Sequence, residues 1–187
     1  MSKPAVYDLA HIQSLVRAIP DFPHKGIVFQ DIFPIFQDPV AIESLTLHLL
    51  TRIKETLGEE TNKVDVVVGL DARGFLFGPA LAIHLGAAFV PVRKQGKLPG
   101  ACTTASYSKE YGTDVLEVQE GAIRPGQRVI IIDDLIATGG TAAAAGELVR
   151  KSKGTIAMYL FVIELLFLKG RDKLEGGSVE SLLHYED

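Results

Sequence analysis

Tryptophan is absent from this chain of 187 residues, and cysteine occurs only once, at Cys102. A single cysteine excludes any disulfide within the chain. Basic residues are also scarce relative to acidic ones, 19 against 23, which gives a net charge of -4. Because a nucleic-acid surface normally needs a basic stripe, we expect no nucleic-acid partner.

Long apolar runs are missing as well. The first fifteen residues, MSKPAVYDLAHIQSL, include Asp8 and lack the apolar stretch of a signal peptide. No run in the chain reaches the length that a membrane-spanning helix needs. These absences predict a cytoplasmic protein without a membrane partner.

What the chain does contain is an alternation of apolar segments with two different periods. No Ser-, Pro- or Gly-rich linker interrupts it, so we expect a single domain over residues 1–187. The spacing predicts strands at 64–70, 89–93, 128–134 and 155–165, and helices at 41–57, 75–86 and 141–152. Continuous apolar strands that alternate with helices predict an α/β fold with a central, mostly parallel sheet flanked by helices.

One long segment departs from this alternation. Residues 94–114, KQGKLPGACTTASYSKEYGTD, are polar, contain glycine and show no clear periodicity. Loops of this length are usually functional lids or disordered segments. We therefore predict a flexible loop at about 94–114.

The segment VIIIDDLIATGGT, residues 129–141, joins a buried strand to a glycine turn and a helix. In an open parallel sheet, ligands bind beyond the carboxyl ends of the strands, and a glycine turn before a helix presents backbone N–H groups to an anion. The positive end of the helix dipole adds to this preference, as do hydroxyl donors beside the glycines. The turn therefore predicts a phosphate site, built from Thr138, Gly139, Gly140 and Thr141.

Two acids, Asp133 and Asp134, stand between the strand and the turn. They would repel a lone phosphate, so the ligand needs a cation or hydroxyl groups beside its phosphate. A ribose 5-phosphate meets both requirements. The chain contains neither GxxxxGK[ST] nor GxGxxG, so the turn is neither a Walker P-loop nor a dinucleotide-binding fingerprint.

The same segment resembles the phosphoribosyl pyrophosphate (PRPP) motif of the type I phosphoribosyltransferases. Further segments are similar to the adenine-specific members of that family: FPHKGIVFQDI, GLDARGFLFGPALA, VPVRKQGKLPG, YSKEYGTD and FLKGRDKL. The resemblance covers roughly residues 17–186. It implies the type I phosphoribosyltransferase fold, with a small hood from about 1–36 and 164–187. It also implies purine salvage, in which PRPP and adenine give AMP and pyrophosphate.

For the sugar, the resemblance implies that residues 137–141, from Ala137 to Thr141, hold the 5-phosphate. Asp133 and Asp134 would bind the ribose hydroxyls and favour the positive charge that grows on the ring as pyrophosphate departs. The other PRPP-binding residues would be mostly basic, since guanidinium groups suit diphosphate oxygens: Arg73, Arg93, Lys94, Lys97 and Tyr111.

The resemblance has three further implications around the pyrophosphate. It implies a cis peptide at Asp71 and Ala72, a feature that residue chemistry alone would not predict. It implies that Arg93 reaches across the interface of a symmetric homodimer. It also implies a Mg²⁺ cofactor that is bound mainly through PRPP, pyrophosphate and water, without a set of protein ligands.

For the base, the resemblance implies that adenine stacks between Phe29 and Leu165 while the backbone of Val28 contacts its amino edge. Glu110 would be the catalytic acid or base, acting at N7 of adenine. Many relatives carry a basic residue at position 30 and a proline at position 25, where this chain has Gln30 and Lys25.

Two alternatives keep the PRPP motif but change the function. One is a transferase for another base, such as a 6-oxopurine, orotate or uracil, whose carbonyl groups need donors where adenine needs an acceptor. The other is a PRPP-sensing regulator that keeps the fold and has lost catalysis. Such a regulator should carry a nucleic-acid surface or an extra domain, and the sequence indicates neither.

Overall fold

The computed structural model describes residues 6–109 and 112–186. Within these residues the chain forms two compact units, which divide between Leu49 and Leu50. The long helix α2, Pro39–Leu57, spans this boundary. It contains the whole of the predicted helix at 41–57.

The smaller unit holds a two-stranded hairpin and short helices. Its elements are α1 (Leu9–Leu15), β1 (Arg17–Pro20), β2 (Val28–Asp31) and the 3-10 turn η1 (Phe33–Gln37). Asp8 begins α1, because its side chain accepts a hydrogen bond of 2.8 Å from the N–H of His11. The strands β1 and β2 pair antiparallel. None of these elements was predicted from the sequence.

Within the described residues, the larger unit contains a seven-stranded sheet in the order β5-β6-β4-β3-β7-β8-β9. The five strands from β4 to β9 in this order pair in parallel, whereas β6 and β5 extend the sheet antiparallel to β4. The strands are β3 (Val66–Leu70), β4 (Ala88–Lys94), β5 (Cys102–Lys109), β6 (Gly112–Gln119), β7 (Arg128–Ile136), β8 (Thr155–Leu165) and β9 (Ser178–Tyr185).

Helices cover the central strands, which are buried on both faces. The helices are α3 (Gly78–Leu85), which packs on β3 and β4, and α4 (Gly140–Lys151), which packs on β5 to β8. Shorter 3-10 turns lie at η2 (Gly58–Lys63), η3 (Arg73–Leu76), η4 (Leu166–Leu168) and η5 (Gly170–Lys173). One core cluster joins the apolar face of α4 to alternate residues of the strands, among them Val66, Val68, Val129 and Ile131. The α/β class and the mostly parallel sheet are thus confirmed.

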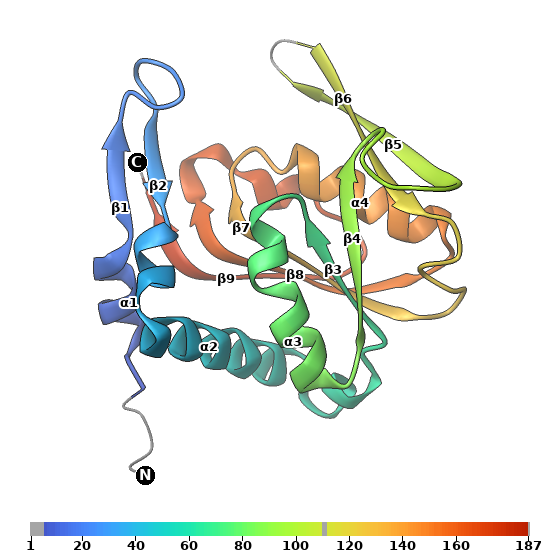
Figure 1. The fold of residues 1–187 in the computed structure, drawn as a ribbon, viewed down its shortest axis with the longest axis horizontal. Helices are drawn as coiled ribbons and strands as arrows, with labels where there is room; N and C mark the ends of the chain where they lie inside the picture. Colours follow the sequence, from blue (N-terminus) through green and yellow to red (C-terminus); the bar gives the residue numbers. More distant parts are fainter. Residues whose placement is uncertain (1–5, 110–111, 187) are drawn as a thin grey trace. The chain divides into compact units, whose positions relative to one another are not determined.

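The expectation of a loop at 94–114 needs correction, because most of this segment is strand. Residues 102–109 form β5, which pairs along its length with β6. The paired strands β5 and β6 extend the sheet beyond β4 (Figure 1). Ala105 lies opposite Leu116, and both are buried. Ala105 and Leu116 belong to different strands and contact each other only because those strands pair. The local sequence of residues 94–114 therefore shows no periodicity that indicates a strand.

The predicted hood draws on both units. Residues 17–31 form the hairpin of the smaller unit, while residues 178–185 form β9, an edge strand of the large sheet. A joint hood stays a prediction. Within residues 6–109 and 112–186, no helix combines the length and the apolar character needed to cross a bilayer. The cytoplasmic location also stays a prediction.

Candidate functional site

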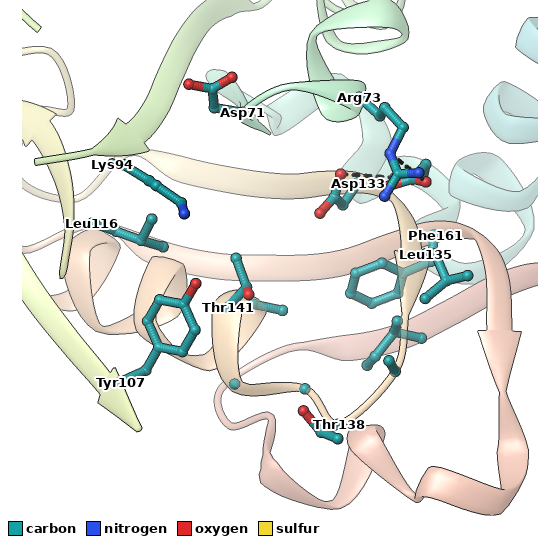
Figure 2. Close-up of a pocket in the computed structure, with 16 residues that line it drawn as sticks. Asp71, Arg73, Lys94, Tyr107, Leu116, Asp133, Leu135, Thr138, Thr141 and Phe161 are labelled. Carbon is teal, nitrogen blue, oxygen red and sulfur yellow. Dashed lines mark hydrogen bonds and ion pairs between the residues drawn. The ribbon is translucent and has the colours of Figure 1, made fainter. Parts of the chain in front are cut away.

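A cavity of about 260 Å³ lies at the carboxyl ends of β3 and β7, where the sequence predicted a ligand site (Figure 2). Its walls come from the segment after β3, the ends of β4 and β7, the β5–β6 hairpin and the start of α4. It brings together most of the predicted PRPP-binding residues that the structure describes: Arg73, Lys94, Asp133, Asp134, Ala137, Thr138, Gly139, Gly140 and Thr141.

The turn between β7 and α4 is open to an anion. Gly139 precedes the helix with a φ of 78°, and no side chain among the described residues caps the N-terminal N–H groups of α4. Those N–H groups and the helix dipole favour a negatively charged ligand at this point. A β-carbon at position 139 would collide with the carbonyl of Gly170, so glycine is required here for space as well as for its φ.

Of the two acids before the turn, Asp134 is buried and Asp133 is half-buried. The N–H of Asp134 donates to Oδ1 of Asp133 at 2.9 Å, and Nε of Arg73 lies 2.9 Å from Oδ2 of Asp134. The Arg73 contact is close enough for an ion pair but lacks hydrogen-bond alignment, so Oδ2 receives no hydrogen bond from any described residue. A buried acceptor in this state favours a ligand with a hydroxyl donor.

Electrostatics lead to the same conclusion. Burial raises the pKa of Asp133 well above its ordinary value, and the neighbouring charge of Asp134 raises it further. Burial also raises the pKa of Asp134, although the positive charge of Arg73 opposes the rise. Raised carboxylate pKa values in a cavity are typical of functional sites. Hydroxyl donors or a growing positive charge on a ligand would stabilise both carboxylates.

Basic and aromatic groups face the acids from the hairpin side of the cavity (Figure 2). Nζ of Lys94 lies 3.2 Å from Oδ2 of Asp114, and the hydroxyl of Tyr107 donates to the same oxygen at 3.3 Å. Sequence reasoning missed Tyr107 and Asp114 as site residues. They lie opposite each other in the β5–β6 pairing, so predicting that hairpin would have revealed them.

Arg93 is not among the described residues that line the cavity. Its Nε donates to Oδ2 of Asp71 at 2.8 Å, and its Nη1 donates to the carbonyl of Lys97 at 3.1 Å. The peptide between Asp71 and Ala72 is cis, as the resemblance implied. Asp71 itself lines the cavity, so Arg93 contacts a residue of the cavity wall.

Lys97 is exposed, and its backbone is anchored by a residue that sequence reasoning did not identify. The N–H groups of Lys97 and Leu98 donate to Oε1 of Glu117 at 2.9 and 2.8 Å. Burial alone would raise the pKa of Glu117, but donation from the backbones of Leu98, Gly96 and Lys97 brings that pKa below its ordinary value. The ionised carboxylate therefore fixes the segment that follows Arg93.

The three residues expected at adenine lie in different units. Val28 is exposed and Phe29 half-buried on β2 of the smaller unit, where Phe29 packs edge-to-face on Phe22 with ring centroids 5.1 Å apart. Leu165 is half-buried at the end of β8 in the larger unit. Gln30, at the position where many relatives carry a basic residue, is buried. A joint role for these residues stays a prediction.

Glu110 and Tyr111 lie outside the described residues, so their expected roles stay predictions. Within the described part of the chain, no group of three or more His, Cys, Asp or Glu residues is arranged to hold a metal ion. The carboxylate oxygens of Asp133 and Asp134 at the cavity are nevertheless the hard donors that Mg²⁺ prefers.

Comparison with known proteins defines the class. The family model for the phosphoribosyl transferase domain matches residues 41–173, and the chain belongs to this family. Within it, the chain is an adenine phosphoribosyltransferase. It is 61% identical to the adenine phosphoribosyltransferase of Yarrowia lipolytica over 163 residues, which cover 87% of this chain and 88% of that relative.

Solved structures agree with this assignment. The Saccharomyces cerevisiae adenine phosphoribosyltransferase, in complex with D-2,5-dideoxy-2,5-imino-altritol 1,6-bisphosphate and adenine, matches with a TM-score of 0.90 and 50% identity, over 94% of this chain and 98% of that one. The Trypanosoma brucei enzyme, in complex with AMP, pyrophosphate and ribose-5-phosphate, matches with a TM-score of 0.81 and 27% identity, over 94% and 78% of the two chains. The type I phosphoribosyltransferase fold is thereby confirmed.

Proposed function

We propose that this protein transfers the 5-phosphoribosyl group of PRPP to adenine, with release of AMP and pyrophosphate. One observation carries the proposal: a single cavity joins an uncapped helix N-terminus to a pair of buried acids, one of which has an oxygen without a donor. Ribose 5-phosphate suits this combination, because its phosphate fits the turn and its hydroxyls fit the acids. The trypanosomal relative was solved in complex with ribose-5-phosphate, among other ligands.

The residues of the cavity then divide the work of the reaction. The turn from Ala137 to Thr141 holds the 5-phosphate, while Asp133 and Asp134 hold the ribose hydroxyls. As the bond from the sugar to pyrophosphate breaks, positive charge grows on the ring, and the nearby carboxylates stabilise it. Arg73 and Lys94 stabilise the negative charge on the departing pyrophosphate.

At the base, Phe29 and Leu165 stack on adenine, and the backbone of Val28 contacts its amino edge. Glu110 manages the proton of the imidazole ring, beside Tyr111. A bound Mg²⁺ would supply charge neutralisation for the pyrophosphate, and it would keep much of its water because this ion dehydrates reluctantly. Asp133 and Asp134 would offer carboxylate oxygens to its hydration shell.

A product assay tests the proposal. The protein is mixed with Mg²⁺ and PRPP, and adenine, hypoxanthine, guanine, orotate and uracil are supplied in separate reactions. We expect AMP from adenine and no nucleotide from the other four bases. Nucleotide from another base alone would identify a transferase of different specificity, and no product from any base would favour a PRPP-binding regulator.

The Glu110→Gln variant tests the proton role. Glutamine keeps the size of the side chain but removes the proton acceptor, so PRPP affinity should survive while the transfer step slows by about 10²-fold. Single-turnover rates at saturating adenine, compared with PRPP affinity measured separately, distinguish the two effects. An unchanged rate would remove Glu110 from the mechanism.

We also propose a symmetric homodimer in which Arg93 acts on pyrophosphate in the partner's site. The family resemblance at VPVRKQGKLPG supports this arrangement. Subunits with Arg93→Ala are mixed with subunits that carry Asp133→Asn and Asp134→Asn. Recovery of activity in the heterodimers is expected, and no recovery in demonstrated heterodimers would reject action in trans.

A further inference from the structure

Another buried carboxylate, on the residue that pairs with the cavity-lining Ile136, has no part in the reaction described above. Glu164, on β8, is 2% exposed. Arg171 binds it through both arms of its guanidinium, with Nε 2.7 Å from Oε1 and Nη2 2.6 Å from Oε2. The hydroxyl of Ser181 on β9 donates to Oε2 at 2.6 Å. Among the described residues that line the cavity, neither Glu164 nor Arg171 appears.

Residues 165–171, which we call the strap, follow Glu164 and end at its partner Arg171. It leaves the end of β8, passes through η4, turns at Lys169 with a φ of 50° and enters η5 at Gly170. Arg171 then returns to Glu164, one residue before the point where the strap began. The ion pair therefore closes the strap at its base.

The tip of the strap touches the phosphate turn, backbone against backbone. Gly170 is buried, and a β-carbon on it would collide with the carbonyl of Ala137. A β-carbon on Gly139 would likewise collide with the carbonyl of Gly170. No side chain fits between the two segments, so a shift of the strap changes the support of the turn directly.

We propose that Glu164 and Arg171 form a positioning pair for the ribose phosphate: their ion pair holds Gly170 against Ala137 and Gly139, and so fixes the turn that binds the 5-phosphate. This inference rests on the proposed function of that turn. The N–H groups of the turn must point at one phosphate position, and hydrogen bonds weaken steeply when they are misaligned. The planar fork of Arg171 fixes direction as well as distance, which a lysine could not do.

The geometry makes the effect selective among ligands. The strap contacts the turn between β7 and α4, whereas the pyrophosphate donors Arg73 and Lys94 lie on η3 and β4. Loosening the strap should therefore weaken binding of ribose 5-phosphate and leave pyrophosphate binding nearly unchanged. A general loss of structure would weaken both ligands together.

Calorimetric titration of the full chain with ribose 5-phosphate, and separately with magnesium pyrophosphate, tests the proposal. Arg171→Met keeps much of the side-chain length and removes the fork. We expect its affinity for ribose 5-phosphate to fall by about tenfold, the lower range for groups that orient a binding site from behind, and its pyrophosphate affinity to stay within about twofold. Lys173→Met, which removes an exposed charge from the same 3-10 turn, is the matched control and should match the wild type.

Two further variants keep the test decisive if Arg171→Met folds poorly. Arg171→Lys should weaken ribose 5-phosphate binding by less than Arg171→Met does. Glu164→Gln should weaken ribose 5-phosphate binding to a similar degree as Arg171→Met. The double variant should bind ribose 5-phosphate no more weakly than either single variant, because both changes remove the same ion pair. Additive losses would reject a joint action.

The failures of the two proposals are distinguishable. If the wild type binds no ribose 5-phosphate, the proposed function of the turn fails, and this inference fails with it. If the wild type binds ribose 5-phosphate and the Arg171 variants bind it equally well, only the positioning pair is rejected. Equal losses for ribose 5-phosphate and pyrophosphate would also reject it, in favour of a general structural role.

Discussion

The neighbouring strands β7 and β8 each carry buried carboxylates toward their carboxyl ends, and these carboxylates differ in state. On β7, burial raises the pKa of Asp133 and Asp134, and one oxygen of Asp134 receives no hydrogen bond from a described residue. On β8, three donated hydrogen bonds satisfy Glu164. The hydrogen bonds from Arg171, the largest influence, bring the pKa of Glu164 below its ordinary value despite burial.

The difference lies in the donors, because desolvation opposes ionisation in both places. The Arg171 fork and the Ser181 hydroxyl meet Glu164 in good alignment, so the ionised form is stable without any ligand. Arg73 offers Asp134 a charge without an aligned hydrogen bond. A buried acid with too few donors is arranged for a ligand, whereas a buried acid with enough donors holds the scaffold.

The largest effect should follow from removing the unsatisfied pair. Asp133→Asn together with Asp134→Asn keeps the size of both side chains and removes their charges. Activity should fall by about 10²–10³-fold, because the growing positive charge on the ribose loses its stabilisation. The unfolding temperature at pH 7 should stay the same or rise, because ionising these buried acids opposes folding. Normal activity in this variant would show that the pair does not serve the ribose.

A smaller effect, on stability instead of catalysis, should follow from Glu164→Gln. The amide keeps the shape but leaves Arg171 without its charged partner, which we expect to cost about 2 kcal/mol of the unfolding free energy. For a protein of this size that corresponds to roughly 4–8 °C in unfolding temperature. The loss of ribose 5-phosphate affinity proposed above should appear as a higher KM for PRPP, whereas turnover at saturating PRPP should change little, because Glu164 does not itself line the described cavity.

Exposed Glu175 provides the control, because Glu175→Gln changes the same chemical group at the surface. Its effect on the unfolding free energy should stay within about 0.5 kcal/mol. If Glu164→Gln instead kept full stability and lost turnover, the two carboxylate sites would have been assigned the wrong way round.

The next variant, Ser181→Ala, keeps the ion pair but removes the hydroxyl that donates to Glu164 and that also lies 3.0 Å from Nε2 of His184. Loss of a single hydrogen bond to a buried carboxylate should cost about 1 kcal/mol, or roughly 2–4 °C. The pKa of Glu164 should rise, because the serine hydrogen bond helps to lower it. Thermal unfolding of Ser181→Ala, measured beside Glu164→Gln, gives the loss of stability. An equal loss of stability in the two variants would mean that the ion pair adds nothing to it.

The sequence allowed the first of these two sites to be predicted but not the second. Asp133 and Asp134 stand between their strand and the glycine turn in one continuous segment, 129–141, so local pattern and parallel-sheet geometry sufficed. The support of that turn comes instead from Gly170, about thirty residues later. The segment FLKGRDKL contributed to the family resemblance, yet its contact with the turn depends on pairing that no local pattern contains.

The hairpin side of the cavity shows the same limit. Tyr107 and Asp114 meet across β5 and β6, and Glu117 anchors the backbone of Lys97 from twenty residues away. The local sequence around each of these residues is typical of a strand or a loop and does not mark the residue as functional. Functional groups that act through long-range pairing could be found only after the sheet had been assembled.

The last predicted effect is a difference in sign between the pH dependences of the two sites. The pKa of Glu164 is lower in the folded protein than the ordinary value of about 4.3, so its contribution to stability is present above that pH and is lost as the pH falls through the folded pKa. The destabilisation caused by Glu164→Gln should therefore be full at pH 7 and should shrink below about pH 4.

The aspartates on β7 should behave in the opposite way. Their folded pKa values lie above the ordinary value of about 3.9, so their contribution to stability is present below that pH and is lost as the pH rises through the folded pKa. The unfolding free energy of the double asparagine variant should thus rise relative to that of the wild type from acid toward neutral pH, by on the order of 1 kcal/mol or about 2–4 °C in unfolding temperature. Unfolding temperatures of the wild type and both variants from pH 3 to pH 8, without substrate, provide the measurement. Parallel curves for the two variants would mean that both sites hold their carboxylates in the same state, and the distinction between a ligand site and a scaffold site would fail.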